Sequence, residues 1–140
     1  IAVILSVFVT IVIFALDKMP VAKAPKILVV NAQSLEAEDD ILDIVEGHFR
    51  IRLNRNSIYF ERFVRHLKFF SQRLFTGKNI YENKADDELL MLFTMKYPDA
   101  FECTKKIKEY IYDTCGHEVS NEEMTYITVH IKRLISEIEV

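Results

Sequence analysis

Apolar residues recur at three- and four-residue spacing in five stretches after residue 33, as they do on the buried face of an amphipathic helix. This pattern predicts helices over about residues 35–49, 57–75, 86–96, 98–115 and 120–138. The apolar stripe of the second stretch consists of Phe60, Phe63, Leu67, Phe70 and Leu74, and that of the fifth consists of Met124, Ile127, Ile131, Leu134 and Ile138. We therefore expect an all-α fold, a bundle of five helices preceded by an N-terminal helical segment.

Polar residues and glycines mark the ends of these helices. Asn56 or Ser57 can cap the start of the second helix, because a short polar side chain there accepts a hydrogen bond from a free backbone N–H. Gly77 suits the position just after its end. Ser120 and Glu123 have the spacing of a capping box, in which each side chain bonds the other residue's backbone N–H at the start of the fifth helix.

Residues 1–16, with the sequence IAVILSVFVTIVIFAL, carry no charge and are a candidate membrane span or secretory segment. Sixteen helical residues span only about 24 Å, however, less than the ~30 Å hydrocarbon core of a bilayer. A secretory segment would need a basic region before the apolar run, and this sequence begins with Ile1. We expect a buried helix without membrane contact, and the alternative is a membrane-anchored helical adaptor.

Composition and charge narrow the classes of protein that fit. The 140 residues are 50% hydrophobic with a net charge of -3, which suits one domain with a packed core. Three glycines and three prolines are too few for a many-stranded sandwich or a glycine-rich phosphate loop. Eight bases over 50–78 suggest nucleic-acid binding, but the six acids over 34–49 would repel a phosphate backbone. We expect the two blocks to neutralise each other, without direct contact of this chain with RNA or DNA.

The two cysteines, Cys103 and Cys115, lack the spacing of a disulfide framework or a zinc site. If both lie on one helix, about 18 Å separates them along its axis, which is too far for a disulfide. We expect free thiols in a cytoplasmic protein.

Two histidines occupy matching places on the predicted helices. With 100° per residue, His66 lies roughly 60° from Phe63, the centre of its apolar stripe. His130 lies roughly 60° from Ile127 in the same sense. Both imidazoles are therefore expected at the margin between core and solvent.

Arginines lie beyond both histidines on the same side, namely Arg62, Arg73 and Arg133. A shielded imidazole beside a guanidinium stays neutral, so a ring nitrogen can act as a nucleophile near neutral pH. A phosphoryl group on that nitrogen would carry up to about two negative charges, which the arginines could bind. The pattern favours phosphorylation of His66 and His130, with the three arginines supporting the phosphate.

Two other interpretations of the histidines stay open. One is a satisfied core histidine, and the other is a small helical metal-binding or catalytic protein that uses His66 and His130. The spacing supplies no third ligand for a metal, so we expect no metal and no cofactor. His48 and His117 stand near predicted helix ends, and we expect both on the surface.

Three motifs resemble the PTS regulation domain, or PRD, of BglG/LicT-type bacterial transcriptional antiterminators. They are RFVRHLKFFSQRLF (62–75), YPDAFECTKKIKEYI (97–111) and SNEEMTYITVHIKRL (120–134), and they occur in the right order. The resemblance covers about residues 34–140 and is closest to the second of the two PRDs in those proteins. It implies a dimerising bundle of five helices whose histidines are reversibly phosphorylated by the sugar phosphotransferase system.

The resemblance carries functional residues over to this sequence. The two PRD histidines fall in the HLKF and HIxR motifs and match His66 and His130, while Arg62 and Arg133 match the accompanying arginines. The family implies a regulatory module rather than an enzyme, a homodimer, and phosphoryl donors that are HPr and/or a sugar-specific enzyme II.

Residues 1–33 match the family only in pieces. VNAQ (30–33) is similar to the end of a first PRD and IFALDK (13–18) to an earlier helix of it, but the TDH-containing motifs are absent. We expect 1–33 to be either a truncated remainder of a preceding PRD or a stretch of it whose intervening residues are not included, and 34–140 to be the PRD itself. The small RNA-binding domain of the antiterminators has no counterpart here, so contact with RNA is expected only through that missing domain. The alternative within the family is the PRD of a DNA-binding transcription activator.

Overall fold

A computed structural model describes residues 6–7, 9–11, 26–76 and 84–138 of the chain. Its five long helices are α2 (Lys26–Phe49), α3 (Ile58–Thr76), α4 (Lys84–Lys96), α5 (Pro98–Cys115) and α6 (Asn121–Ile138). These described ranges contain no strand. The prediction of an all-α fold is confirmed.

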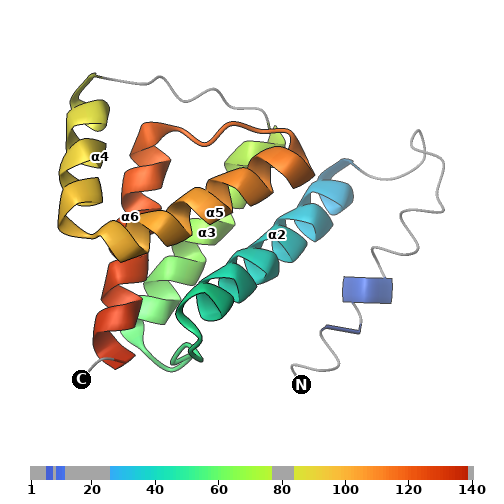
Figure 1. Cartoon of the computed structure of the whole chain (residues 1–140). Coiled ribbons are helices and arrows are strands. Elements are labelled where there is room, and N and C mark those ends of the chain that lie inside the picture. The colour runs from blue at the N-terminus through green and yellow to red at the C-terminus, as the bar shows by residue number, and fades with distance from the viewer. Residues whose placement is uncertain (1–5, 8, 12–25, 77–83, 139–140) are drawn as a thin grey trace.

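Helix α6 packs against three others, α3, α4 and α5, while α2 packs against α3 and α5. Figure 1 shows α2 and α3 side by side in opposite directions, with α5 crossing the bundle and α4 at its edge against α6. The contact between α3 and α6 brings together the two helices that carry His66 and His130.

The core is formed by the apolar stripes that face inward from these helices. Its largest fully buried apolar side chains are Ile41, Val45, Phe63, Leu67, Phe70, Ile107, Ile111, Ile127, Ile131 and Leu134. Burial of this apolar surface is the main stabilising contribution to the bundle, at roughly 1.5 to 3 kcal/mol for each large side chain.

Side-chain caps begin two helices where the sequence predicts them. The Ser57 hydroxyl accepts a hydrogen bond from the backbone N–H of Phe60 at 3.0 Å, so Ser57 rather than Asn56 caps α3. The Ser120 hydroxyl accepts from the N–H of Glu123 at 3.2 Å at the start of α6. Gly77, the residue expected just after α3, lies outside the described residues.

Left-handed residues end two other helices. Gly116 has φ 69 and its N–H donates to the Tyr112 carbonyl at 3.0 Å, which closes α5. Arg50 takes the corresponding position after α2 with φ 54, and the N–H of Ile51 donates to the Glu46 carbonyl at 3.1 Å. This is the 6→1 hydrogen bond that is typical of a Schellman motif, with an arginine in the place where glycine is usual.

The first predicted helix is longer than the pattern indicates. It begins at Lys26 instead of residue 35, because no glycine or proline interrupts the sequence from there to residue 46. The helix therefore passes without a break through the expected boundary between 1–33 and 34–140. That division stays a prediction.

The expectation of a buried helix over residues 1–16 is wrong at Val7 and Ile11, whereas Val9 is half-buried, and residues 1–5, 8 and 12–16 lie outside the described residues. Val7 is 52% exposed and Ile11 58% exposed, although the described part of this run is helical. An apolar helix is buried only where another surface covers it, and the described residues do not cover these two positions. Among the described residues, no helix is both long and apolar enough to cross a membrane.

Candidate functional site

The packing of α3 on α6 places the two predicted histidines next to each other. The ring centroids of His66 and His130 are 5.1 Å apart, with an angle of 34° between the ring planes. Both residues are half-buried, as the helical wheels predict. Two residues 64 positions apart in sequence thus form one imidazole pair at the margin of the core.

A buried carboxylate holds His66. Nε2 of His66 is 3.1 Å from Oε2 of Glu123, and Arg73 donates to the other oxygen, Oε1. Burial by itself raises the pKa of Glu123, but the hydrogen bond from His66 and the positive charge of Arg73 outweigh that effect and hold the pKa below its usual value. Glu123 is therefore ionised at neutral pH, although its side chain is only 6% exposed.

His130 has the opposite electrostatic environment. Burial lowers its pKa to about 4, and the electrostatic influence of the neighbouring His66, Arg133 and Arg62 acts in the same direction. Its ring stacks on Phe63 with centroids 5.8 Å apart. His130 is therefore a neutral imidazole at neutral pH, with one ring nitrogen unprotonated.

Aromatic side chains border the imidazole pair at the surface. The ring of Tyr126 lies 5.7 Å from that of His66, and Tyr126 is 48% exposed. Phe69, which follows His66 by one turn of α3, is 53% exposed. The surface beside the imidazole pair is therefore partly apolar.

Sequence comparisons identify the domain. The family model of the PRD domain matches residues 39–134, which form most of the chain. The chain belongs to the PRD family.

Relatives of this PRD are transcriptional antiterminators. Transcription antiterminator LicT of Bacillus subtilis (strain 168) is 45% identical over 98 residues, which are 70% of this chain and 35% of that protein. The beta-glucoside operon antiterminator of Dickeya chrysanthemi is 32% identical over 100 residues, which are 71% of this chain and 35% of that protein. The PtsGHI operon antiterminator of Bacillus subtilis (strain 168) is 26% identical over 98 residues, or 34% of its length. The chain therefore spans about a third of the length of these relatives.

The three predicted arginines occupy different places in this PRD. Arg62 and Arg133 are exposed and close enough to His130 to lower its pKa. Arg73 is half-buried and already paired with Glu123, and its Nε has no hydrogen-bond partner among the described residues. Arg62 and Arg133 are thus available to a group on His130, whereas Arg73 is bound to the carboxylate beside His66.

Glu123 belongs to the site, although the sequence predicts for it only a place in a capping box. The Ser120 hydroxyl accepts the N–H of Glu123 as that box requires, but the Glu123 carboxylate turns inward to His66 instead of bonding the Ser120 N–H. The position of Glu123 on the helical wheel of α6 indicates its place in the site. With 100° per residue, Glu123 lies roughly 20° from His130 and inside the apolar stripe, where an unpaired acid would be costly.

His48 and His117, which we expect on the surface, are each half-buried there. The ring of His48 packs edge-on against Phe49 with centroids 4.7 Å apart, and that of His117 packs against Phe75 at 6.2 Å. Neighbouring aromatic rings cover both residues at helix ends, which the spacing along single helices does not reveal.

Residues that could bind a metal do not gather in the part of the chain that the structure describes. It contains no group of three or more His, Cys, Asp or Glu side chains that could hold a metal ion. Cys103 and Cys115 are free, and burial raises the pKa of both thiols, that of Cys103 to about 12. Both thiols therefore stay protonated and unreactive at neutral pH.

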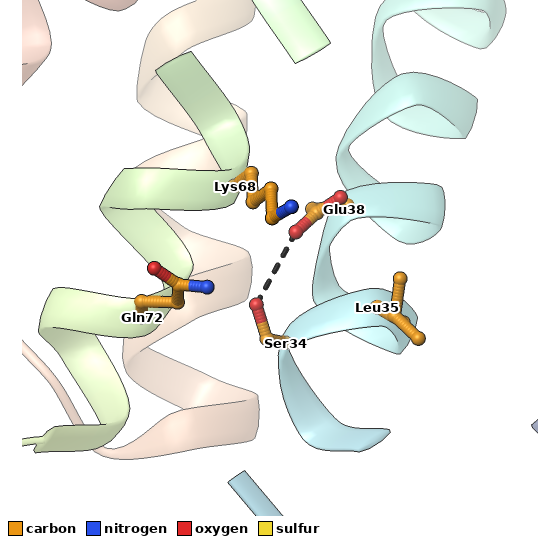
Figure 2. Close-up of a pocket in the computed structure, with 5 residues that line it drawn as sticks. All are labelled: Ser34, Leu35, Glu38, Lys68 and Gln72. Carbon is orange, nitrogen blue, oxygen red and sulfur yellow. Dashed lines mark hydrogen bonds between the residues drawn. The ribbon is translucent and has the colours of Figure 1, made fainter. Parts of the chain in front are cut away.

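A polar hollow of about 320 Å³ lies between α2 and α3, away from the imidazole pair. Figure 2 shows Ser34 and Glu38 of α2 facing Lys68 and Gln72 of α3, with the Ser34 hydroxyl donating to Glu38 at 3.2 Å. Burial raises the pKa of Glu38, although the bond from Ser34 and the charge of Lys68 partly offset this effect. Neither histidine of the pair lines this hollow.

Proposed function

We propose that this chain is the regulatory PRD of a transcriptional antiterminator, in which the sugar phosphotransferase system phosphorylates His66 and His130. The observation that carries the proposal is the imidazole pair between α3 and α6, with ring centroids 5.1 Å apart. The antiterminator relatives favour RNA over DNA as the target of the attached domain.

The environment of the pair suits a reversible phosphoryl acceptor. A nucleophilic imidazole must be neutral, and His130 is held neutral by burial and by the positive charges around it. Arg62 and Arg133 oppose protonation of the ring because a proton adds positive charge. A phosphoryl group adds negative charge instead, so the same two arginines would stabilise the phosphate. The donors in this proposal are HPr and/or a sugar-specific enzyme II, which operate in the cytoplasm.

The output of phosphorylation in this proposal is a change in a homodimer. Tyr126 and Phe69 expose apolar area beside His66, and such area is suited to contact with a second subunit. New negative charge at that contact is costly if unpaired and favourable if arginines of either subunit reach it. The chain thereby passes a signal to its RNA-binding domain and turns over no substrate.

Mapping of phosphate on the chain tests the proposal. The 140-residue chain is incubated with enzyme I, HPr and phosphoenolpyruvate, and acid-labile phosphate is located by peptide mass spectrometry under alkaline conditions. We expect phosphate on His66 and His130 and none on His48 or His117. Phosphate on either of the last two, or none on the imidazole pair, would contradict the proposal.

Sedimentation tests the change in the dimer. His66→Asp and His130→Asp each add one negative charge, and a coupling of about 1 to 3 kcal/mol would change the dissociation constant about 5- to 150-fold. His117→Asp is the matched control and is expected to leave it unchanged. If all three variants had the dimer dissociation constant of the unaltered chain, the proposed effect of phosphorylation on the dimer would be wrong. The proposed phosphorylation sites would be unaffected by that result.

A further inference from the structure

Glu123 is the most deeply buried charged side chain in contact with the imidazole pair, and both of its oxygens are occupied. Oε2 lies 3.1 Å from Nε2 of His66, and Oε1 accepts from Arg73. The residue as a whole is only 4% exposed. The carboxylate is therefore fixed in place from two sides and shielded from competing water.

This contact determines where the hydrogen of His66 lies. An ionised carboxylate accepts hydrogen bonds and cannot donate them, so the nitrogen that faces it must carry the hydrogen. In neutral His66 that nitrogen is Nε2, and the unshared electron pair then lies on Nδ1. A buried acid selects the tautomer of a catalytic histidine in serine proteases by the same principle.

We propose that Glu123 is a positioning residue that directs the phosphoryl group to Nδ1 of His66. This inference rests on the proposed function, because it concerns the same phosphorylation site. Nε2 is excluded for two reasons: its electron pair is not free, and a phosphate there would place negative charge against the Glu123 carboxylate.

The transfer balances without a change in the number of protons on either ring. The electron pair of Nδ1 attacks the phosphorus of a donor phosphohistidine, the donor N–P bond breaks, and its electron pair returns to the donor nitrogen. The donor ring keeps the hydrogen on its other nitrogen and leaves as neutral imidazole. His66 keeps its Nε2 hydrogen and becomes a positively charged phosphoimidazolium, which the adjacent carboxylate stabilises.

His130 provides an internal comparison within the same protein. No carboxylate of the described residues bonds its ring, and its neighbours are His66, Phe63 and two arginines. The isomer of phosphohistidine formed at His130 is therefore expected to be independent of Glu123.

The experiment compares the 140-residue chain with its Glu123→Gln variant. Glutamine preserves the shape of the side chain, removes the charge and offers both a donor and an acceptor to His66. Long-range ¹H–¹⁵N correlation spectra report the tautomer of the unmodified ring, and ³¹P spectra after treatment with enzyme I, HPr and phosphoenolpyruvate report which nitrogen carries phosphate. Glu122→Gln, one residue earlier on α6, is the matched control.

We expect the Nε2–H tautomer and Nδ1-phosphohistidine at position 66 in the unaltered chain and in Glu122→Gln. Glu123→Gln should populate both tautomers and both isomers. Phosphate on Nε2 of His66 in the unaltered chain, or an isomer ratio unchanged by Glu123→Gln, would overturn the positioning role and leave the proposed function intact. An Nε2–H tautomer without any phosphate on His66 would overturn the proposed function itself, and this inference with it.

Discussion

Acidification should destabilise this PRD through His130, because the folded protein resists protonation of that ring. The unfolded ring has a pKa near 6.5, and the folded ring has a pKa of about 4. Between these values the unfolded state binds more protons than the folded state, so acid favours unfolding. The stability is complete above about pH 6.5 and falls as the pH is lowered through this window.

The two pKa values give the size of the effect. At pH 5 almost every unfolded ring is protonated, whereas only about a tenth of folded rings are, which corresponds to about 2 kcal/mol of lost stability. Solvent screening of a half-buried ring reduces this to about 1 to 2 kcal/mol. Glu123 acts in the same direction but at lower pH, because its folded pKa lies below the ordinary value of 4.5.

Urea denaturation at pH 8 and pH 5 measures this loss. The free energy of unfolding of the unaltered chain should be lower at pH 5 than at pH 8. Because His130→Gln removes the titrating group, its loss between the two pH values should be smaller by about 1 to 2 kcal/mol. His117→Gln, at a half-buried histidine outside the pair, should lose as much as the unaltered chain. An equal loss for His130→Gln would refute the argument that burial and the surrounding positive charges keep His130 neutral.

Three further predictions concern the stability of the bundle, each measured as a free energy of unfolding in urea. Gly116→Ala should destabilise the protein by about 1 kcal/mol because Gly116 has φ 69. Gly47→Ala should stabilise it by about 0.5 to 1 kcal/mol, because Gly47 lies inside α2 with open space around it. A change of the same sign in both variants would contradict this prediction. Thr128→Val should destabilise the protein by about 1 kcal/mol, because it removes the buried 2.9 Å hydroxyl contact with Thr104. Replacing both threonines by valine should restore most of that loss. If the losses of the two single variants simply add in the double variant, the contact does not contribute to stability. Phe63→Ala should cost about 3 to 5 kcal/mol because its side chain is fully buried, and a loss below 1 kcal/mol would show that the core closes around the gap.

Helix positions could be predicted wherever a local signal marks them. Helix α5 has the expected bounds, because Pro98 at its start and Gly116 after its end are signals in the sequence itself. The start of α2 could not be predicted in this way. In the sequence, no Ser, Thr, Asp or Asn stands immediately before Lys26 to mark a helix start.

The functional site could be predicted only in part, for a similar reason. The period of a single helix is enough to place His66 and His130 at the margins of their stripes. The bond between His66 and Glu123 joins residues 57 positions apart, and it depends on how α3 docks on α6. Glu123 also fits a local capping motif, and that motif gives no sign that Glu123 lies in the apolar stripe of α6.

In the proposed function, His66 and His130 together are the phosphoryl acceptor of this PRD. The most direct test is the intact mass of the chain after incubation with enzyme I, HPr and phosphoenolpyruvate, measured under alkaline conditions for the unaltered chain and two double variants. We predict that His48→Ala/His117→Ala gains phosphoryl groups as the unaltered chain does, and that His66→Ala/His130→Ala gains none. Undiminished phosphorylation of His66→Ala/His130→Ala would show that other residues accept the phosphoryl group.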